Sequence, residues 1–220
     1  MLCVLMALSM APARAVCIDV EPTAVLKASP FASEWARWGT VESTADAVFV
    51  DGDKRYRWMG ITWHSKFGGA LFIVDCDGRT LAARQMGTLY KFGEWVMLPG
   101  LPGPAMFVED QVGSGTGYRE SRLSLLYLDR DQIRSLWERP IFRQGGRGDE
   151  TCLPRMCVTD EFRWHWSSGS QRLTVLGFRT VLKAAGKDGA ETFSAKLLPS
   201  EAFCWNVRRQ MMLACRPAVE

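Results

Sequence analysis

The chain has 220 residues, of which 47% are hydrophobic and 23% are charged. This length and composition allow a full hydrophobic core and exclude global disorder. The formal net charge is only +3, and the basic residues are spread along the chain without the clustered face that nucleic-acid binding requires.

The amino terminus has the layout of a secretory signal peptide. An apolar stretch from Leu2 to Leu8 precedes the small-residue site Ala13-Arg14-Ala15, where such peptides are cleaved. No Lys or Arg precedes this stretch, so an upstream start, a buried first helix and lipid attachment at Cys17 stay open as alternatives. We expect residues 1–15 to be a signal peptide and residues 16–220 to form a single all-β domain. The mature chain is then secreted or periplasmic and has no membrane span.

The cysteine count predicts a disulfide framework. The six cysteines after residue 15 are Cys17, Cys76, Cys152, Cys157, Cys204 and Cys215. An even number in an exported chain indicates three disulfide bonds. Cys152 and Cys157 bracket a four-residue loop, and Cys204 lies opposite Cys215 if residues 209 and 210 form a two-residue turn, which leaves Cys17 for Cys76. Two histidines and no C-x-x-C pair disfavour zinc, and we expect neither a metal nor a cofactor.

One short helix is predicted near the amino terminus. Residues 16–28 have the character of an extended arm. In the next segment Ser29 is a suitable cap, Pro30 suits the first helical position, and Gly39 suits the end of a helix. The aromatic residues of this segment recur at helical spacing, so we expect them to pack on the core.

From Ala47 onward the hydrophobic period is two, which predicts strands. The expected strands cover residues 47–50, 54–63, 70–74, 80–85, 95–98, 105–108, 123–128, 132–138, 162–166, 173–182 and 191–197, with a hairpin over 202–215. Residues 132–138 also fit one helical turn. The proline-rich stretch 99–104 excludes a helix or an interior strand there.

A glycine-rich turn followed by an apolar strand and an acidic turn recurs along the chain. Leu71, Leu123 and Leu173 hold matching places in these segments, at separations of 52 and 50 residues. Strand units at such a period are typical of propeller blades. We therefore expect an all-β, disulfide-stapled fold of blade-like, repeated antiparallel sheets with one short amino-terminal helix. A small propeller-like fold is the first interpretation and a β-sandwich the alternative.

Two groups of residues suggest ligand chemistry but also have a structural interpretation. Three Asp-x-Asp pairs, at residues 51 and 53, 75 and 77, and 129 and 131, offer oxygen ligands to calcium. Aspartate and glycine also favour turns, and we expect turns here. The triplet of glycines at residues 113, 115 and 117 lacks the lysine of a phosphate loop and indicates a hairpin loop.

No complete catalytic signature occurs in the sequence, so we expect a binding module. Nine tryptophans are present; most aromatic side chains fill cores, but an exposed ring beside an arginine can hold a partner. The candidate ligand-binding residues are His64, Arg163, His165 and Trp166. The expected ligand is a protein partner or an envelope glycan. The alternatives are a secreted carbohydrate- or peptidoglycan-hydrolysing enzyme and a structural envelope component.

Overall fold

The computed structural model describes residues 19–51, 54–64, 68–115, 118–145, 156–183 and 192–215. In this part of the chain there are two short helices, α1 (Pro22–Lys27) and α2 (Ala32–Ala36). The strands are β1 (Ser43–Asp51), β2 (Lys54–His64), β3 (Gly68–Asp75), β4 (Thr80–Gln85), β5 (Thr88–Val96), β6 (Ala105–Gly115), β7 (Tyr118–Asp129), β8 (Gln132–Gly145), β9 (Met156–Ser167), β10 (Arg172–Lys183), β11 (Thr192–Leu197), β12 (Glu201–Asn206) and β13 (Met211–Cys215).

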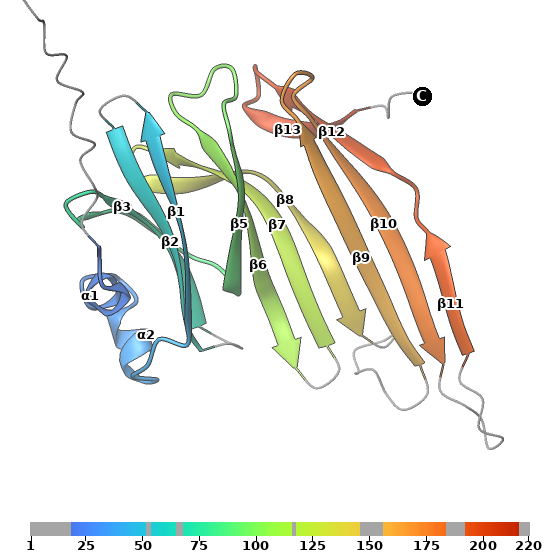
Figure 1. Ribbon diagram of the computed structural model, residues 1–220, viewed down its shortest axis with the longest axis horizontal. Helices are drawn as coiled ribbons and strands as arrows, with labels where there is room; N and C mark the ends of the chain where they lie inside the picture. The colour runs from blue at the N-terminus through green and yellow to red at the C-terminus, as the bar shows by residue number, and fades with distance from the viewer. Residues whose placement is uncertain are drawn as a thin grey trace, which may run out of the picture.

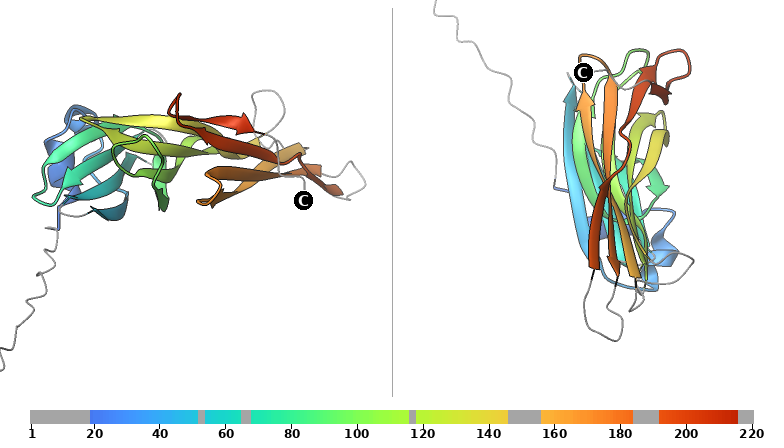
Figure 2. Two further views of the ribbon diagram at one scale, coloured as in Figure 1. Left: turned by 90° about the horizontal axis from the view of Figure 1, so that it is seen from above. Right: turned by 90° about the vertical axis from the view of Figure 1, so that its right-hand side faces the viewer.

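The strands form two antiparallel sheets that largely follow the order of the chain. The first sheet has the order β1-β2-β3-β4, and the second has the order β13-β12-β10-β9-β8-β7-β6-β5, with β11 paired to β10 (Figure 1). Seen from above, the molecule is elongated, with the helices at one end and β9, β10 and β11 at the other (Figure 2). The prediction of a mostly antiparallel β structure is confirmed.

The finer prediction of a propeller or a sandwich is not confirmed. The three leucines at matching places are all fully buried, in β3, β7 and β10. However, β5 to β13 form one continuous hydrogen-bonded sheet, and the described residues form no closed barrel or ring of separate blades.

The amino-terminal segment differs from the prediction of an extended arm and one helix. Pro22 begins α1, and Val25 and Leu26 of this helix are buried against the first sheet. α1 ends at Lys27, and Ser29 closes the turn that follows it: the hydroxyl of Ser29 donates to the carbonyl of Leu26 and accepts from the amide of Phe31. The predicted helix is therefore shortened to α2, and the arm contains a helix that the sequence pattern missed. None of the helices in the described ranges is long and apolar enough to cross a membrane.

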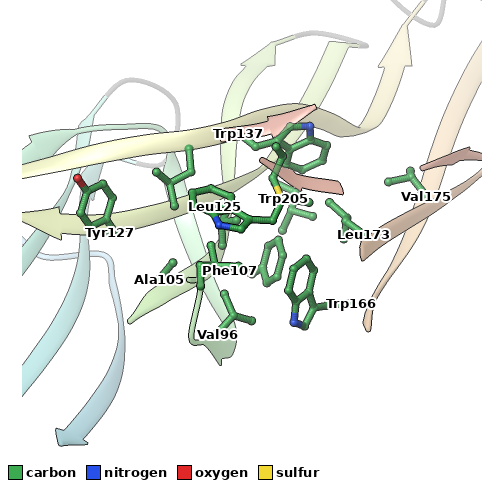
Figure 3. Close-up of a cluster of buried hydrophobic side chains, with 14 of the residues drawn as sticks. Val96, Ala105, Phe107, Leu125, Tyr127, Trp137, Trp166, Leu173, Val175 and Trp205 are labelled. Atoms are coloured by element: carbon green, nitrogen blue, oxygen red, sulfur yellow. The ribbon is translucent and has the colours of Figure 1, made fainter. Parts of the chain in front are cut away.

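The second sheet opens into a fork between β8 and β9. These strands pair only over Phe142–Gly145 and Val158–Glu161 and then diverge. An apolar cluster fills the space between β5–β8 and the strands beyond the fork. In Figure 3, Phe107 lies beside Trp166, and Trp137 and Trp205 lie close by. The ring centroids of Phe107 and Trp166 are 5.8 Å apart.

The connection between β4 and β5 ties the two sheets together. The amide of Gly87 donates to Oδ2 of Asp110 at 2.6 Å, and the amide of Leu89 donates to the hydroxyl of the buried Thr62 at 3.0 Å. Tyr90 of β5 lies directly on Gly60 of β2. A shared apolar cluster continues this contact, with Trp58, Leu71 and Ile73 from the first sheet and Tyr90, Met106, Val108 and Leu126 from the second.

One of the three predicted disulfide pairs lies wholly within the described residues and is confirmed. Cys204 is bonded to Cys215, with 5.7 Å between their Cα atoms. The expected two-residue turn is wrong, because Cys204 lies opposite Leu213 and residues 207–210 form a longer turn. The amide of Arg209 donates to the side chain of Asn206 in that turn. Cys76 and Cys157 are also disulfide-bonded, but Cys17 and Cys152 lie outside the described residues, so the other two pairings stay predictions.

Candidate functional site

A row of large apolar side chains is exposed on one face of β10 and β11. We call this surface the apolar face; it consists of Leu176, Phe178, Leu182, Phe193 and Leu197. Phe178 lies opposite Leu197, and Leu182 lies opposite Phe193, so the register places these side chains on the same side of the sheet. The exposed fractions run from 40% for Phe178 and Leu182 to 70% for Phe193.

The strand β11 has the alternation of a half-buried strand but is exposed on both faces. Phe193, Ala195 and Leu197 alternate with polar residues, yet every residue of β11 is exposed. Within the described part of the chain, β11 is hydrogen-bonded only to β10. A strand with this pattern usually buries its apolar side. The chain therefore presents a sheet face that its own described residues leave uncovered.

Arg163 of β9 joins the apolar face to an open groove. Its guanidinium lies over the ring of Phe178, 5.9 Å from the centroid, and lies 3.9 Å from a carboxylate oxygen of Glu161. The groove begins at the fork between β8 and β9 and has a volume of about 630 Å³. Its lining residues are Lys91, Glu109, Arg119, Ser121, Ile141, Phe142, Glu161, Phe162, Arg163 and Trp164.

The polar groups of the groove are mostly engaged with one another. The indole N–H of Trp164 donates to Oε1 of Glu109 at 3.0 Å, and Lys91 lies 3.6 Å from Oε2 of the same residue. Arg119 lies over the ring of Phe142 at 5.6 Å. Trp164 also packs on Phe107, with 4.8 Å between ring centroids. The groove is therefore a mixed aromatic and charged surface that is already organised by internal contacts.

Both carboxylates of the groove are paired with cations, Glu109 with Lys91 and Glu161 with Arg163.

The structure brings together two of the four residues predicted as a ligand site. Arg163 and His165 lie on the same face of β9, with Arg163 opposite Leu176 and His165 opposite Thr174. Trp166 lies on the other face and is buried in the apolar cluster. His64 ends β2 in the first sheet, where its ring lies 3.9 Å from that of Trp38. The members of the apolar face were missed, because their alternation matches that of an ordinary core strand.

The Asp-x-Asp pairs that the structure describes serve local contacts. Asp75 accepts hydrogen bonds from the amides of Asp77 and Arg79 and forms an ion pair with the Arg79 side chain. Asp129 forms an ion pair with Arg134 at 3.0 Å, and the hydrogen bond from Arg134 lowers the pKa of Asp129. These two Asp-x-Asp pairs lie at turns, as expected. The side chains of residues 51 and 53 lie outside the described residues.

Comparison of the chain with protein families, with curated proteins and with solved structures finds no match.

Proposed function

We propose that the protein is an exported, disulfide-stapled binding module whose ligand is a protein partner held on the apolar face. Export rests on the signal-like residues 1–15 and on the cysteine count. The single observation that carries the binding role is the exposure of five large apolar side chains on one face of β10 and β11.

The clustering of these side chains distinguishes them from ordinary surface hydrophobics. Of the 13 exposed large hydrophobic residues in the described ranges, five belong to the apolar face, and the other eight are spread over several elements. Single apolar residues on a surface are common, whereas a contiguous patch marks an interaction surface. Aromatic side chains and arginine are the residues that most often dominate such interfaces, and Phe178, Phe193 and Arg163 supply them here.

The apolar face favours a protein over an envelope glycan, the other ligand class that the sequence predicts. A glycan needs many hydrogen-bonding groups beside an aromatic ring, and the five side chains of the apolar face carry none. A protein can instead bury this face and add a strand to the outer edge of β11. A fixed structural partner in the envelope would use the same contacts, so it is one form of this proposal.

Site-directed photo-crosslinking in the producing cell tests the proposal. Phe193 is replaced by p-benzoylphenylalanine, which keeps the aromatic ring in place, and the matched control carries the same group at Met97, which is 64% exposed. We expect an adduct of one defined mass from position 193 and none from position 97. An adduct of twice the chain mass would identify the partner as a second copy of this protein.

Binding measurements with the purified protein and its crosslinked partner then give the affinity. Phe193→Asp places a charge within the proposed interface and should weaken binding of the crosslinked partner at least tenfold, because a buried unpaired charge is strongly unfavourable. Val48→Asp, at an exposed position of β1, should leave the affinity unchanged. Equal crosslinking at positions 193 and 97, or unchanged binding by Phe193→Asp, would contradict the proposal.

A further inference from the structure

A second cavity, separate from the apolar face, lies where the two sheets meet. This junction pocket has a volume of about 450 Å³, within the range of small-molecule sites in proteins. Its apolar walls are Phe49, Tyr56 and Trp58 of the first sheet, Leu128 of β7, and Pro102 and Pro104 from the connection between β5 and β6. Trp95 of β5 holds two of these rings in place, at centroid distances of 4.9 Å from Phe49 and 5.5 Å from Trp58.

The charged groups of the junction pocket come from one turn. Among the described residues that line the pocket, Asp129 and Arg130, at the connection between β7 and β8, are the charged ones. The carboxylate of Asp129 is paired with Arg134 at 3.0 Å. Arg130 is exposed and takes part in no ion pair with a described residue. The pocket therefore combines apolar walls with an exposed arginine beside Asp129, whose carboxylate is already paired with Arg134.

The backbone at Arg130 supports a role for its side chain. Arg130 has φ of 59°, in the left-handed region, at the first central position of a two-residue turn. Glycine is favoured at such a position, and an arginine there costs stability. Side chains kept in unfavourable backbone conformations often serve a site. An arginine at a position where glycine would fold more easily is explained if the guanidinium binds a ligand.

We propose that the junction pocket binds a small amphiphilic anion with a flat, ring-bearing apolar body and a carboxylate. The ring would lie between the aromatic side chains and the prolines, and the carboxylate would accept hydrogen bonds from Arg130. A sugar fits this lining less well, because sugars need polar groups around their whole edge, whereas the charged groups here lie on one side. The guanidinium fork matches a carboxylate in geometry as well as in charge.

Calorimetric titration of the purified chain tests this assignment. The probes are benzoate, phenylacetate and indole-3-acetate, with tryptamine as the cationic and 3-methylindole as the uncharged analogue of the last. We expect at least one carboxylate to bind with a dissociation constant below about 1 mM and the analogues without the negative charge to bind at least tenfold more weakly. Failure of all three carboxylates, or equal binding of the cationic analogue, would overturn the proposal.

Substitution of Arg130 separates binding from folding. Arg130→Gly should raise the melting temperature by about 2–4 °C because it relieves the left-handed strain, and it should weaken carboxylate binding roughly tenfold or more. Arg130→Lys should retain part of the affinity. Gln171→Gly is the matched control, since Gln171 also has a left-handed φ, of 49°, but lies outside the pocket; it should raise the melting temperature without changing affinity. Undiminished binding by Arg130→Gly would show that the arginine is not the anion contact.

Discussion

Asp110 is the one charged side chain that is buried among the described residues. Both of its oxygens accept hydrogen bonds from Arg122, at 3.1 and 2.8 Å, and Oδ2 also accepts the amide of Gly87. Burial alone would lower the pKa of Arg122, but the hydrogen bond to Asp110 and the negative charge of Asp110 outweigh burial. The pKa of Arg122 is therefore raised. The hydrogen bonds between Asp110 and Arg122 replace those that both side chains make with water in the unfolded chain. Through the amide of Gly87, Asp110 also fixes the connection between β4 and β5.

Removal of Arg122 should therefore be costly. Arg122→Ala leaves the carboxylate of Asp110 buried beside a single amide, and we expect a loss of about 3 kcal/mol in the free energy of unfolding. Urea denaturation of the wild type and the variant measures this loss in the free energy of unfolding. Arg79→Ala, which breaks an exposed pair with Asp75, should cost less than about 1 kcal/mol. Similar small losses for both variants would show that Arg122 is not needed to stabilise the buried carboxylate.

Two pairs of residues show what can and what cannot be predicted from the sequence. The disulfide between Cys204 and Cys215 was predicted from their spacing around a turn. The predicted register of β12 and β13 was wrong, because the turn between them has four residues instead of two. Asp110 gave no signal, since its partner lies 12 residues away on the facing strand. A sequence pattern shows which residues alternate, whereas only the register of the strands shows which of them meet.

The strands β4, β7 and β8 are linked by charges on one side of the molecule. Glu138 of β8 forms ion pairs with Arg84 of β4 at 2.8 Å and with Arg122 of β7 at 3.3 Å. Burial alone would raise the pKa of Glu138, but a hydrogen bond from Ser135 and the two arginine charges outweigh burial, so the pKa lies below its ordinary value of 4.5. The folded chain therefore holds this carboxyl ionised at a pH where the unfolded chain already binds a proton.

The sign of the resulting pH dependence follows from this difference. The contribution of Glu138 to stability is fully present above about pH 4.5 and is lost as the pH falls through the lower pKa of the folded state. Glu138→Gln should reduce the free energy of unfolding at pH 7 by about 1 kcal/mol, and the difference from the wild type should shrink towards pH 3. Glu94→Gln, at an exposed position of β5, should show no such convergence. A constant difference for Glu138→Gln at both pH values would contradict the mechanism.

At the scale of elements, periodicity predicted where the strands lie, but it could not predict which other elements cover them. The ambiguous residues 132–138 belong to a strand, β8, as expected. The alternation of β11 was also recognised, but alternation cannot show whether another element covers the apolar side. For the same reason the segment before Ser29 was predicted as an arm, although it forms a short helix that buries Val25 and Leu26 against the first sheet. Tertiary contacts decide both outcomes.

At the scale of the whole molecule, the two sheets are held together by a close contact of backbone and ring. The 50-residue spacing identified three leucines that are fully buried in β3, β7 and β10, but it could not show that β5 to β13 hydrogen-bond as one sheet. That continuity depends on the short ladder between β8 and β9. The boundary between the sheets instead lies at the β4–β5 connection, where the buried ring of Tyr90 rests on Gly60.

A single methyl group at this boundary should loosen both sheets together. In Gly60→Ala the added Cβ would overlap the Tyr90 ring, and the buried ring has little room to move, so we expect a loss of about 1–3 kcal/mol in the free energy of unfolding. Gly169→Ala is the control, because its Cβ would meet no atom within 4 Å. Hydrogen exchange by the amides of β3 and of β7 should accelerate to a similar extent, since the sheets share the apolar cluster around Tyr90. Faster exchange confined to the first sheet would mean that the second sheet keeps its stability without this contact and that the two sheets unfold as separate units.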